Sequence, residues 1–93
     1  MHNEKLDRLR KKIDKVDHKL LNVIKKRTNL VKKVIKEKKF KKQIVDRNRI
    51  KKVLKNIKNL SNKKKIDHKL TRKIWISMIN SYIEYEKRNF NKK

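Results

Sequence analysis

The 93-residue chain contains no glycine and no proline. β-Hairpins and sheets lean on these two residues, because tight turns need a positive or a fixed φ angle. Short polar connections between helices need neither residue. We therefore expect an all-α protein. A chain of this length forms at most one small domain, predicted here over residues 1–93, and an oligomer would add to its modest core.

Apolar residues recur every three or four positions through the first third of the chain, which predicts one very long helix over about residues 5–39. Asn3 can cap its start. Such a helix measures roughly 50 Å, at 1.5 Å per residue, and overhangs any core that this chain can build. We therefore expect it to pack along a second copy of itself. The repeat consists of Leu6, Leu9, Ile13, Val16, Leu20, Val23, Leu30 and Val34, with Arg27 in the place of an apolar residue.

Two further helices are predicted, a short one over residues 46–60 and a medium one over 67–90. The apolar face of the short helix is formed by Ile50, Val53, Leu54, Ile57 and Leu60. Asp67 is a good N-cap for the medium helix. Its apolar residues are Leu70, Ile74, Trp75, Met78, Ile79, Tyr82 and Ile83. The segments "KKFKKQIV" and "LSNKKKI" interrupt the periodicity and predict loops between the three helices.

The chain is strongly basic, with 33 Lys and Arg residues against nine Asp and Glu and a formal net charge of +24. Such an excess is typical of polyanion binders. The lysines are spread over all three predicted helices, however, and few aromatic residues could stack on bases. We therefore expect no specific nucleic-acid partner, and keep a non-enzymatic basic nucleic-acid-binding helical protein as an alternative.

Several kinds of chemistry lack the residues they need. Without cysteine there are no disulfides, no thiolate catalysis and no Cys-ligated zinc. His2, His18 and His68 show no metal-ligand spacing, and there is no glycine-rich phosphate loop. The start "MHNEKLDRLRKK" has no apolar signal region, and no run approaches a membrane span. We expect no cofactor, no metal, no membrane association and a cytoplasmic location.

Six charged residues lie on or beside apolar helix faces. They are Arg10, Arg27, Lys38, Asp46, Arg49 and Glu86. A charge in a helix seam costs stability unless it is paired or meets a ligand. Any one of them could be a register device or a snorkelling side chain. Together, from three helices and mostly cationic, they predict a buried anion site in which the four cations hold two carboxylates. No nucleophile–base pair stands out, so an enzyme with this site would act by positioning and electrostatics.

Three blocks of sequence carry a resemblance to a known family. They are "LRKKIDKVDHKLLNVIKKRTNLVKKVIKEK" at residues 9–38, "DRNR" at 46–49 and "IDHKLTRKIWISMINSYIEYE" at 66–86. The chain resembles the AroQ-class chorismate mutases, the all-helical type, over nearly its whole length. The resemblance implies an intertwined homodimer in which the long first helices pair and each active site is shared.

It also implies the rearrangement of chorismate to prephenate in the shikimate pathway of aromatic amino acid biosynthesis, without a cofactor or a covalent intermediate. By motif position, Arg10 would reach in from the partner chain and Arg27 would bind a substrate carboxylate. Lys38 would bridge a carboxylate and the ether oxygen of the breaking bond, and Glu86 would face that oxygen. Asp46 and Arg49 follow in the family's order in the second helix. Arg27 would thus leave the apolar stripe because the seam opens there around a dianion.

The chain departs from the family pattern at three site positions. Ile50 stands where the family often has a Glu that contacts the substrate hydroxyl, Tyr82 where it often has Ser, and Glu86 where many members have Gln. The loop between Lys38 and Arg49 is one residue shorter than in many mutases. The apolar residue, the aromatic residue and the short loop are similar to features of isochorismate pyruvate-lyases, which share the fold. A lyase of that kind is the alternative enzyme.

Overall fold

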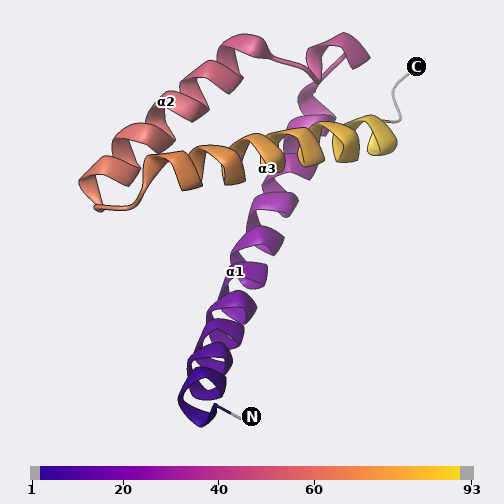
Figure 1. Cartoon of the computed structure of the whole chain (residues 1–93). Helices are drawn as coiled ribbons and strands as arrows, with labels where there is room; N and C mark the ends of the chain where they lie inside the picture. Colours follow the sequence, from indigo (N-terminus) through magenta and orange to yellow (C-terminus); the bar gives the residue numbers. More distant parts are fainter. Residues whose placement is uncertain (1–2, 91–93) are drawn as a thin grey trace. The chain divides into compact units, whose positions relative to one another are not determined.

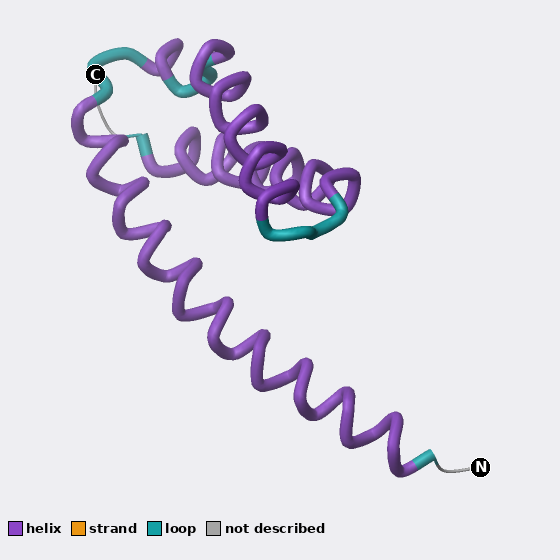
Figure 2. The backbone as a smooth tube through the Cα atoms, turned by 90° about the vertical axis from the view of Figure 1, so that its left-hand side faces the viewer, coloured by secondary structure: helices purple, strands orange, loops and turns teal. Residues whose placement is uncertain are grey.

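A computed structural model describes residues 3–90 and confirms the all-α class. Over this span the chain forms α1 (Glu4–Glu37), a single 3-10 turn η1 (Lys41–Gln43), α2 (Arg47–Lys63) and α3 (His68–Asn89), as Figures 1 and 2 show. The three α-helices are one very long, one short and one medium, as predicted. The chain divides into two compact units, Met1–Val34 and Ile35–Lys93. The prediction of a single domain stays a prediction.

The first unit consists of most of α1. Asn3 caps the helix as predicted, since its Oδ1 accepts the backbone N–H of Leu6 at 3.1 Å. The helix has 34 residues, about 51 Å at 1.5 Å per residue. This unit contains no second element against which α1 could pack, and the apolar stripe is exposed. Its exposed members are Leu6, Leu9, Ile13, Val16, Leu20, Val23, Leu30 and Val34.

Two predicted helix ends are wrong. The first helix ends at Glu37 rather than 39, because the amide side chain of Gln43 accepts the N–H groups of Lys39 and Phe40 that a longer helix would use. The short helix runs to Lys63 rather than residue 60. It closes with Lys65 in the left-handed region at φ 58° and with hydrogen bonds from Lys65 N–H to the Asn62 carbonyl and from Ile66 N–H to the Ser61 carbonyl.

This C-terminal pattern is a Schellman motif, in which glycine usually takes the left-handed position. The chain has no glycine, so a lysine occupies it. The two hydrogen bonds, 3.2 and 2.8 Å long, satisfy carbonyls that the helix end would otherwise leave without partners. The connection to α3 is therefore only a few residues long, and the predicted loop "LSNKKKI" is mostly helix.

The helices α2 and α3 pack against each other in the second unit. Asp46 and Asp67 cap them, accepting the N–H groups of Arg49 at 3.0 Å and Lys69 at 2.9 Å. Near the connecting turn the buried hydroxyls of Ser61 and Thr71 share a hydrogen bond of 2.7 Å. The half-buried apolar residues that line this packing are Val53, Leu54, Ile57, Trp75, Met78 and Ile79.

Part of the predicted apolar faces of α2 and α3 is not covered. Ile50, Tyr82 and Ile83 are half-buried, whereas Leu60, Leu70 and Ile74 are exposed. Two packed helices cover only the sides that they turn toward each other. Among the described residues the buried apolar side chains are Ile35, in the last turn of α1, and Ile44, in the segment between α1 and α2. The unit thus exposes part of its apolar side chains.

Candidate active site

Lys38 and Glu86 form an ion pair in the second unit. Lys38 Nζ donates a hydrogen bond to Glu86 Oε1 at 2.8 Å, across 48 positions of sequence. Lys38 follows the last residue of α1, and Glu86 lies in the last turns of α3. The side chains are only 18% and 10% exposed, respectively. The structure therefore brings together the two residues for which contact with the reacting oxygen was predicted.

The position of Glu86 follows from the apolar face that it extends. Trp75, Ile79 and Tyr82 precede it along one side of α3 and are half-buried, and Glu86 itself is buried. A carboxylate without a partner in such a place would be costly. The ammonium of Lys38 supplies the partner, and no described buried side-chain nitrogen or oxygen lacks a hydrogen bond.

Hydrogen bonds hold the backbone on both sides of Lys38. Its own N–H donates to the Ile35 carbonyl at 3.2 Å, and Ile35 is buried. On the other side, Gln43 Oε1 accepts the N–H groups of Lys39 at 2.7 Å and of Phe40 at 2.8 Å. Sequence reasoning missed Gln43, which lay in a stretch assigned only as a loop. The one sequence feature that could have indicated its role was a hydrogen-bond acceptor side chain among lysines.

The first turn of α2 carries three more of the predicted site residues. Asp46 is the N-cap, and its Oδ1 accepts the Arg49 N–H. This structural task accounts for an acid at the position, and substrate binding by Asp46 stays a prediction. Arg49 is exposed, and Ile50 is half-buried. A cation, a carboxylate and an apolar side chain therefore lie within one turn of helix.

Tyr82 lies one turn before Glu86 on α3. Its ring meets that of Tyr85 edge to face, with centroids 6.2 Å apart and an interplanar angle of 81°. Aromatic pairs favour this geometry. The Tyr85 ring also has the Arg88 guanidinium 6.0 Å from its centroid. The side chain of Tyr82 is thus part of an ordered aromatic group beside the buried acid.

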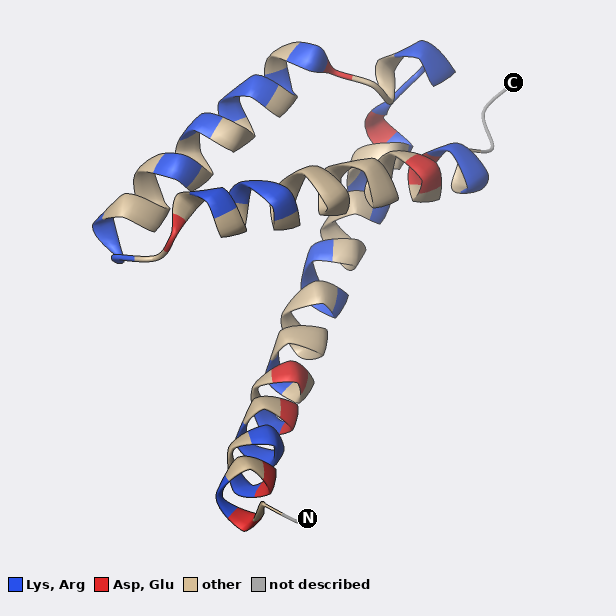
Figure 3. Ribbon diagram, viewed as in Figure 1, with Lys and Arg blue, Asp and Glu red and all other residues tan. Residues whose placement is uncertain are grey.

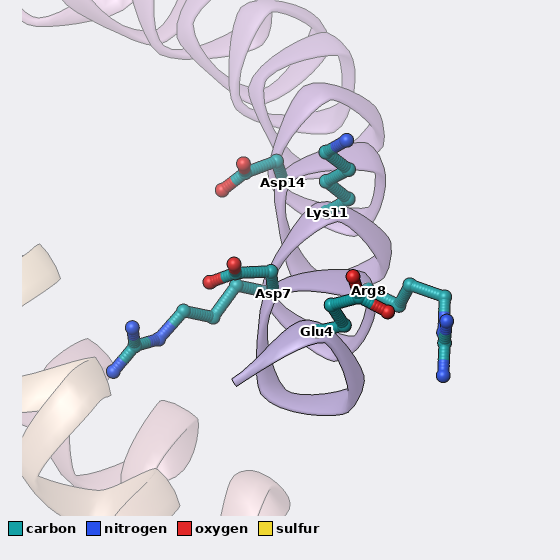
Figure 4. Close-up of a pocket in the computed structure, with 6 residues that line it drawn as sticks. Glu4, Asp7, Arg8, Lys11 and Asp14 are labelled. Atoms are coloured by element: carbon teal, nitrogen blue, oxygen red, sulfur yellow. The ribbon is translucent and has the colours of Figure 1, made fainter. Parts of the chain in front are cut away.

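Arg10 and Arg27 belong to the first unit, whereas Lys38 and Glu86 belong to the second. Arg27 is half-buried and Arg10 is exposed. Arg10 contributes to a hollow near the start of α1, and Figure 4 shows that the labelled side chains lining it all project from one helix. Its other lining residues are Glu4, Asp7, Arg8, Lys11 and Asp14. The joining of Arg10 and Arg27 with the second unit in one site stays a prediction.

Residues 3–90 also bear on two other kinds of site. Over that range no group of three or more His, Asp or Glu residues could hold a metal ion, and His2 lies outside it. No helix in the same range is both long and apolar enough to cross a membrane.

The arrangement in the second unit has a defined chemical capacity. A lysine ammonium has three donors, so Lys38 can keep its bond to Glu86 and still donate to an oxygen of a ligand. Arg49, in the first turn of α2, carries a guanidinium that can pair with a carboxylate in bidentate fashion. Its joining with Lys38 and Glu86 in one site stays a prediction. A donor such as Lys38 can stabilise negative charge that develops on an oxygen of a ligand.

Comparison with known proteins identifies the family. The profile of the family described as chorismate mutase type II matches residues 9–87, which span Arg10, Arg27, Lys38, Asp46, Arg49, Ile50, Tyr82 and Glu86. No significant match was found among curated proteins or among solved structures. A match over most of the chain, together with the all-helical fold, shows that this chain belongs to the chorismate mutase type II family, the AroQ class.

Proposed function

We propose that the protein is a chorismate mutase that rearranges chorismate to prephenate. The observation that carries the proposal is the partly buried Lys38–Glu86 pair at 2.8 Å, which joins the end of α1 to the last turns of α3. The family pattern assigns these two positions to the ether oxygen of the substrate. Membership of the family supports the reaction type.

The proposed reaction requires no covalent bond between the protein and the substrate. One carbon–oxygen bond breaks while one carbon–carbon bond forms within the same molecule, and nothing is added or lost. The protein must hold the substrate in its folded, reactive conformer, and positioning of this kind can supply several kcal/mol. It must also aim donors at the ether oxygen, which gains charge as its bond breaks; losing one such donor typically costs about 100- to 1000-fold in rate.

Lys38 and Glu86 are the proposed donors to this oxygen. Lys38 donates from its ammonium, and Glu86 donates when it is protonated. The substrate is a dianion, and Arg27 and Arg49 are proposed to pair with its carboxylates, with Asp46 beside them. Guanidinium groups suit this task because they pair with carboxylates through two parallel hydrogen bonds.

We propose that the active protein is a homodimer and that Arg10 enters the site from the partner chain. The exposed apolar stripe of α1 supports a partner, because the first unit offers nothing to cover it. The charges of α1 support an antiparallel pair. Four of its five acids, Glu4, Asp7, Asp14 and Asp17, lie in its first half, as the red segments in Figure 3 show. Antiparallel pairing sets this half against the second half, whose net positive charge is higher because it contains only one acid, and so avoids placing the two second halves side by side.

A second candidate function is that of an isochorismate pyruvate-lyase. Ile50 favours it, because this half-buried apolar side chain cannot contact a substrate hydroxyl as a glutamate would. Tyr82 and the short loop after Lys38 point the same way. Both candidates need a cationic site for a dicarboxylate, so they differ in substrate and not in the residues that bind the carboxylates.

Product analysis decides between these functions. The purified protein is incubated separately with chorismate and with isochorismate, and the products are identified by chromatography and NMR. Prephenate from chorismate supports the proposal, and pyruvate with salicylate from isochorismate supports the lyase. Lys38→Met, which removes the ammonium but keeps a long side chain, serves as the control and should lose the activity. Absence of both products would favour a non-enzymatic protein.

A further inference from the structure

The exposed loop after α1 contains a closed set of hydrogen bonds centred on Gln43. Its Oε1 accepts from Lys39 N–H at 2.7 Å and from Phe40 N–H at 2.8 Å. Its own backbone N–H donates back to the Phe40 carbonyl at 3.0 Å. Both partners of the side chain are donors, so the oxygen and not the amide nitrogen must face them. The side-chain oxygen and the backbone N–H of Gln43 therefore both hold this turn.

The loop carries several positive charges that oppose its compact turn. Lys38, Lys39, Lys41 and Lys42 stand within five residues of one another, and their like charges repel. The turn is anchored at its far end by Ile44, which is only 4% exposed and whose N–H donates to the Lys41 carbonyl at 3.1 Å. At the near end, Lys38 N–H is bonded to the Ile35 carbonyl. The hydrogen bonds of Gln43 lie between these two anchored ends of the loop.

We propose that Gln43 is a positioning residue that fixes the backbone immediately after Lys38 and so holds the Lys38 ammonium beside Glu86. The inference rests on the proposed function in so far as Lys38 acts on the substrate. Without the Gln43 oxygen, two adjacent N–H groups lose their acceptor and turn to water, and the segment that carries Lys38 gains freedom. Small displacements of a positioned group can lower rates strongly.

Three variants separate this role from a general effect on the loop. Gln43→Met removes the acceptor at nearly constant length, and Gln43→Glu keeps an acceptor oxygen at the same reach. Lys41→Met is the matched control, since Lys41 lies in the same turn and is also exposed. We expect Gln43→Met to lower kcat/KM by roughly 10-fold, mainly through kcat, since one or two hydrogen bonds are lost. Gln43→Glu should recover most of this loss, and Lys41→Met should stay near wild type.

The structural readout is independent of activity. Amide hydrogen exchange followed by NMR should show protection of the Lys39 and Phe40 N–H groups in the wild type and in Gln43→Glu, and loss of it in Gln43→Met. Thermal unfolding should be nearly unchanged in all three variants, because the side chain is exposed.

The outcomes are distinct. Unprotected amides in the wild type, or lost protection in Gln43→Met with unchanged kcat, would overturn the role of Gln43. If the wild type fails to turn over chorismate, the proposed function fails, and the side-chain NMR signal of the Lys38 ammonium becomes the readout. If this signal shows a fixed Lys38 side chain in the wild type and a freely moving one in Gln43→Met, it still supports positioning by Gln43. The same signal in both proteins would refute that role.

Discussion

Replacing Leu20 by lysine tests whether α1 is an interface. Leu20 lies near the middle of the 34-residue helix, so any pairing along the length of α1 includes it. Lysine is a good helix former, and the change leaves the propensity of the helix nearly intact. We expect Leu20→Lys to weaken the dimer strongly and to abolish activity, because a site that borrows Arg10 from the partner is incomplete in the monomer.

The size of the effect follows from the exposure of Leu20, which is 52%. Complete burial of a leucine side chain contributes about 1.5–3 kcal/mol, so covering the remaining half contributes about 0.8–1.5 kcal/mol per copy. The change occurs in both chains, which gives about 1.6–3 kcal/mol per dimer, and lysine must in addition bend its ammonium out to water. At about 1.4 kcal/mol per decade, the lost burial alone should raise Kd by about 10- to 100-fold, and the cost of the lysine adds to this.

Sedimentation and light scattering over a range of protein concentrations measure this shift, and circular dichroism reports whether α1 stays helical. Asn22→Lys is the matched control. It adds the same charge two residues later, on the side of α1 away from the apolar stripe, and should leave mass and activity unchanged. A Leu20→Lys protein that remains a fully active dimer would show that the stripe is not the interface and that Arg10 has no role across chains.

Three further expectations concern the site and the fold. Arg10→Ala and Arg27→Ala should each be nearly inactive, whereas refolding a mixture of the two chains should restore about a quarter of wild-type activity, since half of the dimers then hold one intact site; no recovery would mean that sites are not shared. Lys65→Gly should raise the free energy of unfolding by about 0.5–1 kcal/mol in a chemical denaturation experiment, because glycine relieves the left-handed φ of 58°, while Lys64→Gly, at φ −86°, should lower it. Glu86→Ala should lower kcat/KM by about 100-fold, because it removes the side chain proposed to face the reacting oxygen, whereas Glu86→Gln, which keeps a hydrogen-bond donor of similar size, should retain activity; equal kcat/KM values in all three proteins would mean that Glu86 does not touch the reacting oxygen.

The sequence predicts where helices begin better than where they end. Asn3 and Asp67 cap their helices as predicted, and Asp46, expected only to begin the short helix, caps α2. The ends depended on less regular features. Lys65 takes a conformation normally left to glycine, and Gln43 captures N–H groups from a distance of three and four residues. Neither feature shows in residue type alone.

The candidate site, too, could be predicted only in part. Helical periodicity placed Glu86 on an apolar face, and the structure shows it buried with Lys38 as its partner. The direct contact of the two could not be predicted, since it depends on the path of the chain from residue 38 to residue 86. Arg10 and Arg27 lie on a helix whose apolar side nothing in its own unit covers. Their surroundings depend on what packs there, which no pattern within one chain determines.

The Lys38–Glu86 pair sets a requirement on substrate binding. In the free protein the ammonium and the carboxylate satisfy each other in a site that is largely shielded from water. A dianion brings further negative charge to the same place, and the Glu86 carboxylate would oppose both the proposed substrate and the charge that grows on its ether oxygen. Binding is therefore favoured when Lys38 turns part of its donor capacity from Glu86 to the ligand. On this reasoning Glu86→Gln, which removes the opposing charge at nearly constant size, should bind a non-reacting dicarboxylate analogue more tightly than the wild type does in calorimetry. Equal or weaker binding by Glu86→Gln would show that the charge of Glu86 does not oppose the ligand.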